Sequence, residues 1–272
     1  MTCPICFRHC FLEEGQIGFC RARKSKAGII AADNYGLVTS LALDPIEKKS
    51  LKEFYPGSLI LSVGSYGCNL RCPFCQNYEI SQANLKSRST YISPDKLVKE
   101  ALDLKSEGNI GIAFTYNEPM VGVEYVKDCA KLTKENNLKT VLVTNGCTSL
   151  FALKQILPYI DAMNIDLKGF SEDYFKYIGS DFEMTKAFIK ASYEAKVHIE
   201  LTTLIVPSHN DSPLDMDKEC QWIASLNPKI PLHITRYFPM YHESVAMTPI
   251  ETINKLTEIA KKHLTSVYQG NI

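Results

Sequence analysis

The sequence predicts an α/β fold, namely a partial (βα)6 TIM-like barrel of parallel strands that follows a small N-terminal cysteine-rich module. From about residue 58, short runs rich in Val, Ile and Leu alternate with helical patterns, as expected for parallel strands covered on both faces. Polar side chains follow the ends of successive runs, where the loops of such a barrel carry its active site. The length of 272 residues suits one barrel domain.

Residues 1–57 do not follow this alternation. We expect them to form a metal-binding module and a connecting loop ahead of a barrel at 58–272. The module contains four cysteines with the spacing C-x2-C-x3-C-x9-C, which are Cys3, Cys6, Cys10 and Cys20. Four thiolates so close together suit either a closed tetrahedral zinc site or an accessory iron–sulfur cluster. The opening C-P-x-C slightly favours zinc, and His9 is a further candidate ligand.

Six apolar runs predict the parallel strands, and one more run near the C-terminus offers a seventh. The runs span 58–67, 109–117, 139–146, 161–168, 197–207, 230–239 and 266–272. Periodicity alone does not separate a partial barrel from a doubly wound open sheet, so that fold remains the alternative.

Helical patterns fill the segments between these runs. They span 93–108, 123–136, 149–160, a long region that ends near Lys196, a segment around Trp222 and a last helix after Thr248. Ser93 is the expected N-cap of the first helix, and Pro94 suits its first position. Thr248 and Glu251 predict a capping box at the start of the last helix.

The composition argues against two classes of partner. The chain has 30 basic and 30 acidic side chains, so it lacks the positive charge typical of a nucleic-acid-binding protein. No apolar run approaches the roughly 18 residues expected of a membrane span. The N-terminus lacks the apolar core of a signal peptide. We therefore expect a cytoplasmic protein, in which grouped cysteines indicate metal binding and not disulfides.

A second group of cysteines follows the first predicted strand. Cys68, Cys72 and Cys75 form a C-x3-C-x2-C motif. A structural zinc site closes with four ligands, whereas a metal that does chemistry keeps one position open. Three thiolates therefore indicate a reactive metal centre. The remaining cysteines stand alone, and we expect small buried side chains there. They are Cys129, Cys147 and Cys220.

Polar residues at the later strand ends complete the candidate site. They are Thr115, Tyr116, Asn117 and Glu118 on the second strand, Thr144 and Asn145 on the third, Asp166 and Lys168 on the fourth, Thr202 and Thr203 on the fifth, and Arg236, Tyr237 and Tyr241 near the end of the sixth. Because the βα loops of a barrel converge at one end, we expect these residues to surround one site beside the cysteine motif.

The stretch CNLRCPFC resembles the C-x3-C-x-(aromatic)-C motif of the radical S-adenosylmethionine (SAM) superfamily. The resemblance implies that the three thiolates hold a [4Fe–4S] cluster and that SAM takes the open iron. It also implies reductive cleavage of SAM to methionine and a 5′-deoxyadenosyl radical, which abstracts a substrate hydrogen. The electron would come from a donor protein such as flavodoxin or ferredoxin.

The same resemblance assigns contacts to SAM. Asn117 and Glu118 would face its amino group, since a carboxylate suits a positive group. Phe74 precedes the third cysteine, where the family lays its backbone against the adenine. Further contacts would come from Thr144, Asn145, Asp166, Lys168 and Thr202. For Asp166 and Lys168, the alternative is a solvated ion pair past the end of a strand.

Within the superfamily, TNG, DLK, LIVP and FCQN resemble pyruvate formate-lyase activating enzymes. DPIEKKSLKEFYPGS and GCNLRCPFCQNYEIS are similar to the AmmeMemoRadiSam-type branch. The first resemblance implies a glycyl-radical enzyme as the partner. Two features depart from it, because a Gly-rich strand with Arg is missing and Val143 stands where activating enzymes tend to have Asp. The alternatives are radical modification of a small molecule and, outside enzymes, an iron–sulfur electron carrier.

Overall fold

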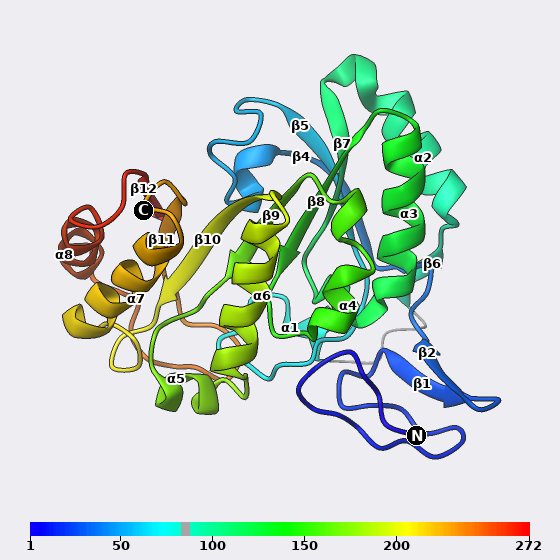
Figure 1. The fold of residues 1–272 in the computed structure, drawn as a ribbon, viewed down its shortest axis with the longest axis horizontal. Coiled ribbons are helices and arrows are strands. Elements are labelled where there is room, and N and C mark those ends of the chain that lie inside the picture. The colour runs from blue at the N-terminus through cyan, green and yellow to red at the C-terminus, as the bar shows by residue number, and fades with distance from the viewer. Residues whose placement is uncertain (83–87) are drawn as a thin grey trace.

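The structure is a computed structural model that describes residues 1–82 and 88–272. Its main element is an eight-stranded sheet with the order β12-β11-β10-β9-β8-β7-β5-β4 (Figure 1). The strands are Ser40–Pro45 (β4), Leu59–Gly64 (β5), Asn109–Phe114 (β7), Lys139–Thr144 (β8), Ala162–Asp166 (β9), His198–Ile205 (β10), Leu232–Arg236 (β11) and Val267–Gly270 (β12).

The strand order confirms the partial barrel. From β5 to β12 each strand of this sheet pairs in parallel with the strand of the sheet that follows it along the chain. A doubly wound sheet would need a reversal of strand order at its middle, so the alternative fold is excluded. The seventh run also forms its strand, because Val267 in β12 stands opposite Leu232 in β11. β4 and β12 are the two edges of the sheet, so the barrel stays open between them.

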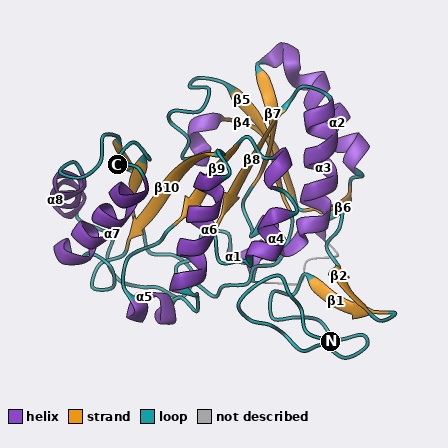
Figure 2. Cartoon of the chain, viewed as in Figure 1, coloured by secondary structure: helices purple, strands orange, loops and turns teal. Residues whose placement is uncertain are grey.

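Helices cover the outer face of the curved sheet (Figure 2). They are Pro94–Asp103 (α2), Val123–Glu135 (α3), Leu150–Lys154 (α4), Phe182–Glu194 (α6), Pro213–Leu226 (α7) and Ile250–Ala260 (α8). The main hydrophobic core lies between this layer and the strands, with side chains such as Val126, Leu142 and Phe188 almost fully buried. Among the described residues, no helix combines the length and the apolar character needed to cross a membrane.

Two helix predictions need correction. The long helical region before Lys196 is two helices, Glu172–Tyr177 (α5) and α6, because Gly179 adopts a φ of +66° and Asp181 begins α6 as its N-cap. The predicted capping box of α8 is also wrong, since Pro249 is the N-cap. Thr248 instead donates a hydrogen bond to the carbonyl of Ile205 in β10.

The first helix begins as predicted. The Ser93 hydroxyl accepts a hydrogen bond from the Lys96 N–H, and Pro94 occupies the first helical position. Leu97, Val98 and Ala101 are buried on one face of α2, as its apolar spacing requires.

The N-terminal segment lies at the same end of the sheet as the short helix α1 (Tyr78–Ser81) (Figure 1). It contains the hairpin Arg23–Lys26 (β1) and Ile29–Ala32 (β2). Two further short strands pair with each other, Leu37–Val38 (β3) and Thr90–Tyr91 (β6). The buried Arg23 forms an ion pair of 2.7 Å with Glu124 on α3, so the hairpin is attached to the barrel.

Part of the predicted connecting loop contributes to the barrel itself. β4 pairs antiparallel with β5, and the short 3₁₀ helix η1 (Ile46–Lys49) follows it. Ile46, Leu51 and Phe54 then pack inside the curve of the sheet against Val141 and other inward-facing side chains. These residues close the barrel at the amino ends of its strands. The division of the chain at residue 57 stays a prediction.

A buried carboxylate holds in place the segment that closes the amino end of the barrel, which we call the floor. Glu200 in β10 accepts hydrogen bonds from the backbone N–H groups of Lys52 and Glu53 at 2.9 and 2.8 Å. It is also within 3.0 Å of His198 Nε2 and 2.6 Å of His233 Nε2. Burial would raise the pKa of Glu200, but these four partners outweigh it and lower the pKa to about 2.

We predict that Glu200→Gln destabilises the fold. The amide keeps the shape but loses the charge that four donors share, so the free energy of unfolding should fall by about 2–4 kcal/mol near neutral pH. Because the pKa of Glu200 is lowered on folding, the contribution is present above about pH 4.5 and is lost as the pH falls toward about 2.

Urea unfolding under anaerobic conditions, repeated across this pH range, measures the difference. Glu194→Gln is the matched control, because Glu194 is exposed and only 3.9 Å from Lys190 at the end of α6. Equal stability of the wild type and Glu200→Gln at neutral pH would contradict the assignment.

Candidate functional site

The three motif cysteines lie in the loop that leaves the carboxyl end of β5. Cys72 is buried, whereas Cys68 and Cys75 are half-buried. Gly67, which precedes the motif, has a φ of +93°, and a Cβ there would lie 2.5 Å from the carbonyl oxygen of Cys20. Only glycine therefore permits this loop to pack so closely on the N-terminal segment.

A pocket of about 860 Å³, which includes space open to solvent, lies between this loop and the strand ends. It brings together most of the side chains expected at the site. These are Cys68, Cys72, Phe74, Cys75, Asn117, Glu118, Thr144, Asn145, Asp166 and Lys168. They come from the ends of β5, β7, β8 and β9, so the convergence of βα loops explains their meeting.

Glu118 connects the loops after β7 and β8. Its Oε1 accepts hydrogen bonds from Thr144 Oγ1 at 2.7 Å and Met120 N at 3.0 Å, and its Oε2 accepts one from Asn145 N at 2.8 Å. Burial raises the pKa of this carboxyl to about 7, although all three hydrogen bonds favour the charged form. A carboxylate offers about four acceptor positions, so one remains for a group in the pocket.

Asn145 carries this connection on to the cysteine loop. Its Nδ2 donates to Asn69 Oδ1 at 2.9 Å and lies 3.7 Å from the sulfur of Cys68. Asn69 is fully buried and donates in turn to the carbonyl of Cys147 at 2.7 Å. The Leu70 N–H also points to the Cys68 sulfur, at 3.4 Å. Asn69 was not predicted, and only its place inside the cysteine motif could have indicated it.

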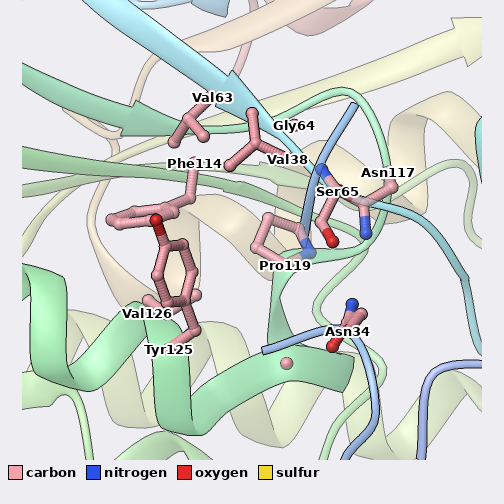
Figure 3. A pocket seen from close by; sticks show the side chains of 11 residues that line it. Asn34, Val38, Val63, Gly64, Ser65, Phe114, Asn117, Pro119, Tyr125 and Val126 are labelled. Carbon is pink, nitrogen blue, oxygen red and sulfur yellow. The ribbon is translucent and has the colours of Figure 1, made fainter. Parts of the chain in front are cut away.

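Asn117 shapes the turn before the cysteines. Its Oδ1 accepts a hydrogen bond from Ser65 N at 3.0 Å, and its Nδ2 donates to the carbonyls of Tyr66 and Gly67. It also lines a second, smaller pocket of about 330 Å³ behind the turn, where it lies beside Ser65 and Pro119 (Figure 3). Its amide therefore supports the loop that carries Cys68.

Asp166 and Lys168 form an ion pair within the pocket, where Nζ and Oδ2 are 2.8 Å apart. The Lys168 side chain is 15% exposed and that of Asp166 34% exposed, so the pair is partly shielded from solvent. Burial would lower the pKa of Lys168, but the charges of Asp166 and Cys72 raise it above its usual value. A fixed positive charge thus stands beside the motif cysteines.

Tyr116 extends the pocket toward the barrel interior, with a φ of +72°. Its ring occupies the space beside Gly64, where a Cβ would lie 2.8 Å from the ring. Its hydroxyl donates to Asp44 Oδ2 at 2.7 Å, and the buried Lys49 lies 4.9 Å from the ring centroid. Tyr116 could be predicted from its place at a strand end, whereas Asp44 and Lys49 could not, because neither lies at the end of a parallel strand.

Phe74 and Thr202 differ in their placement. Phe74 is buried in the wall of the pocket and meets the ring of Tyr237 edge-to-face. Thr202 is not among the described residues that line the pocket, since its hydroxyl pairs with Asn164 at 2.9 Å inside the barrel. Leu204, two positions further along the same face of β10, lines the pocket instead.

The loop after β11 returns to the cysteine loop. The N–H groups of His242 and Glu243 both donate to the carbonyl of Pro73, at 2.8 and 3.1 Å. Tyr241 stacks on Tyr78 of α1 with ring centroids 4.6 Å apart. Tyr237 is buried, and Arg236 Nε donates to the carbonyl of Thr248. Of the three residues expected near this edge, Tyr241 is therefore the most exposed.

The four N-terminal cysteines also come together. Cys3, Cys6 and Cys20 are buried, Cys10 is half-buried, and all four line one pocket of about 320 Å³, which includes space open to solvent. Burial and, to a smaller extent, the other three cysteines raise the pKa of the Cys6 thiol to about 12. His9 is exposed and is not one of the residues around this cavity.

The isolated cysteines are small buried side chains, as predicted. All ten cysteines of the chain are free thiols, and Cys129, Cys147 and Cys220 are fully buried.

Comparison with known proteins decides the family. The family profile described as the Radical SAM superfamily matches residues 62–220, which contain the cysteine loop and the strand ends around the pocket. The chain belongs to the radical SAM superfamily. An uncharacterized protein of Methanocaldococcus jannaschii is 38% identical to it, with 100% of this chain and 81% of that protein covered.

More distant relatives have named activities. The pyruvate formate-lyase-activating enzyme of Clostridium pasteurianum is 28% identical, over 59% of this chain and 67% of that enzyme. A radical SAM methyltransferase from Sphaerobacter thermophilus aligns with a TM-score of 0.62 at 14% identity, covering 79% of this chain and 67% of that one. At such identity the structural likeness speaks for the radical SAM fold alone, and the fold agrees with the partial barrel.

The donor set of this radical SAM protein fits the cluster and SAM that the superfamily implies. Among the described residues, no three Cys, His, Asp or Glu side chains converge as ligands of one metal ion. Three soft thiolates around a shared space suit an iron–sulfur cluster, in which each thiolate binds a different iron. Hydrogen bonds to the Cys68 sulfur, such as those of Asn145 and Leu70, tune the potential of such a cluster.

We predict that Glu118→Gln weakens SAM binding by about 1–3 kcal/mol, the scale of one hydrogen bond to a charged group. The amide keeps the size of the side chain but removes the negative charge that faces the pocket. Isothermal titration of the anaerobically reconstituted protein with SAM measures the change. Glu100→Gln, on the exposed face of α2, is the control and should bind as the wild type does. An unchanged affinity in Glu118→Gln would leave this residue with a structural role only.

Proposed function

We propose that this radical SAM enzyme reductively cleaves SAM at a [4Fe–4S] cluster held by Cys68, Cys72 and Cys75. When bound, the cluster supplies one electron to SAM, which yields methionine and a 5′-deoxyadenosyl radical able to abstract a substrate hydrogen. The observation that carries the proposal is the shared pocket of the three thiolates and the Glu118–Asn145 network. A one-electron donor protein such as flavodoxin or ferredoxin completes the reaction.

The side chains around the pocket would divide the binding of SAM between them. Glu118, whose fourth acceptor position is free, would attract the positive amino group, while Asn117 keeps the loop before Cys68 in place. The backbone at Phe74 would lie against the adenine, and Thr144, Asn145, Asp166 and Lys168 would complete the walls. Thr202 would contribute indirectly, because it does not line the pocket and its hydroxyl pairs with Asn164 inside the barrel.

The positive charge of Lys168 would serve the same pocket. Asp166 holds it at 2.8 Å, on the side of the pocket where Cys72 lies. In a site shielded from water, a fixed cation stabilises negative charge on thiolates and on a carboxylate of a bound ligand. The buried floor around Leu51 and Phe54 keeps water from entering through the other end of the barrel.

The four N-terminal cysteines would form a second metal site, either zinc or an iron–sulfur cluster, in a metal-binding module that residues 1–57 form together with a connecting loop. Their gathering around one cavity supports this proposal. The stretches DPIEKKSLKEFYPGS and GCNLRCPFCQNYEIS support the place of this chain in the AmmeMemoRadiSam-type branch.

The proposed substrate is a glycine Cα–H of a partner protein, as in the activation of a glycyl-radical enzyme. Similarity to two relatives supports it. One is the pyruvate formate-lyase-activating enzyme of Clostridium pasteurianum. The other is a putative glycyl-radical enzyme activating enzyme of Methanocaldococcus jannaschii, which is 26% identical over 75% of this chain and 77% of that protein. The open side of the partial barrel would admit a loop of such a partner. Modification of a small molecule is the alternative.

We predict that anaerobically reconstituted, reduced protein converts SAM into 5′-deoxyadenosine and methionine. Replacement of Cys68, Cys72 or Cys75 by Ala removes one thiolate ligand and should abolish both products, as measured by liquid chromatography with mass spectrometry. Cys220→Ala is the control, because Cys220 is buried in α7 away from the pocket. Undiminished cleavage in the three motif variants would refute the assignment.

A second prediction concerns the hydrogen that the radical removes. Deuterated candidate partner proteins and deuterated metabolites are each supplied during turnover, and 5′-deoxyadenosine is analysed for deuterium. Transfer from a protein glycine is the expected result, because the proposed reaction removes a glycine Cα hydrogen. Transfer from a metabolite, with none from a protein glycine, would overturn the activating role and leave the cleavage of SAM intact.

A further inference from the structure

We propose that Cys3, Cys6, Cys10 and Cys20 hold a second iron–sulfur cluster and that electrons enter the protein through it on their way to the cluster of Cys68, Cys72 and Cys75. The inference rests on the proposed function, because it assigns the route by which that reaction receives its electron. It commits the N-terminal site to one kind of metal centre and gives it a role in the reaction.

The shape of the N-terminal site favours a cluster over zinc. A structural zinc ion brings four sulfurs onto one point, at about 2.3 Å from the metal. In the described part of the chain no three such ligands converge in that way, although the four cysteines line one pocket, whose volume of about 320 Å³ includes space open to solvent. The motif cysteines are arranged in the same way, because they also line a shared space and do not converge on one point.

The two groups of cysteines are in direct contact through the backbone. The Cys68 N–H donates a hydrogen bond to the Cys20 carbonyl at 3.2 Å. Two ligand side chains, one from each proposed cluster, are therefore linked through a few covalent bonds and one hydrogen bond. Gly67 makes this contact possible, since a Cβ there would lie 2.5 Å from the same carbonyl oxygen. A short connected path of this kind suits the transfer of an electron.

Two guanidinium groups stand between the sites. Arg8 lies over the ring of Phe19, 3.8 Å from its centroid, and its Nε donates to the Asn69 carbonyl at 3.2 Å. Arg71 lies over the same ring at 4.0 Å and donates to the carbonyls of Cys68 and Phe19. Clusters with thiolate ligands carry negative charge, so cations between them reduce their mutual repulsion and favour the reduced states.

The exposure of the four cysteines indicates where a donor approaches. Cys10 is half-buried, and the other three are buried. Phe11 and Ile17 beside it are 69% and 41% exposed, and Phe19 donates its N–H to the Cys10 sulfur. A low-potential flavodoxin that docks here loses one electron to the N-terminal cluster. That cluster is oxidised again as it passes the electron to the motif cluster, where SAM cleavage consumes it.

The first experiment counts metal in the full-length protein after anaerobic reconstitution with iron and sulfide in the presence of zinc. The wild type should contain about eight irons and eight sulfides, as two [4Fe–4S] clusters require. The Cys68, Cys72 and Cys75 triple Ala variant should keep about four irons and a cluster signal in electron paramagnetic resonance after reduction. A double variant, Cys6→Ala with Cys10→Ala, should also keep about four.

Cys129→Ala controls for the loss of a buried cysteine outside both sites and should match the wild type. A wild type that contains about one zinc ion and only the roughly four irons of a single cluster would overturn the proposal. A triple variant that contains no iron would overturn it as well. Because the triple variant leaves the N-terminal cysteines intact, this test stands even if the double variant fails to fold.

The second experiment separates the route of the electron from the chemistry at the pocket. The wild type and the double variant are compared in SAM cleavage with two reductants, reduced flavodoxin and the small molecule dithionite. Cleavage by the double variant should be lost with flavodoxin and kept with dithionite, which reaches the motif cluster directly. Full activity with flavodoxin, or loss with both reductants, would overturn the relay. A wild type inactive with both would instead refute the proposed function.

Discussion

The buried carboxylate of Glu118 is the constraint on which the site depends. It draws the ends of β7 and β8 together through Thr144 Oγ1 and Asn145 N. That position of Asn145 lets its side chain reach both Asn69 and the sulfur of Cys68. A chain of hydrogen bonds therefore runs from a strand end to a proposed cluster ligand. The amide of Asn117, the N-terminal segment and the loop after β11 give the cysteine loop its further support.

Two buried glutamates lie at opposite ends of the barrel, and their pKa values shift in opposite directions. Glu200 at the floor meets four donors, which outweigh its burial and lower its pKa. Glu118 at the mouth meets three donors, and burial prevails, so its pKa is raised. The four partners of Glu200 occupy its acceptor positions and hold the segment that follows η1. Glu118 keeps one acceptor position toward the pocket, which is what a binding site for a cationic ligand needs.

Much of the fold could be predicted because its signals are local. The apolar runs, the N-cap at Ser93 and the spacing of the cysteines each lie within a few residues, and the strand order follows from the connection of successive β–α units. The capping box at Thr248 failed for the opposite reason. The Thr248 hydroxyl instead donates a hydrogen bond to the carbonyl of Ile205, which lies 43 positions earlier in the chain.

The sequence by itself determined the family, the three motif cysteines and the strand ends that meet at one pocket. Only the tertiary structure decided which side chain on each strand faces that pocket, so that Leu204 and not Thr202 lines it. It also decided that Asp44 supports Tyr116 and that Cys20 touches Cys68. These contacts join residues that lie many positions apart in the chain. A sequence motif contains only the spacing of nearby residues, whereas the packing of the N-terminal segment against the barrel determines which distant groups meet.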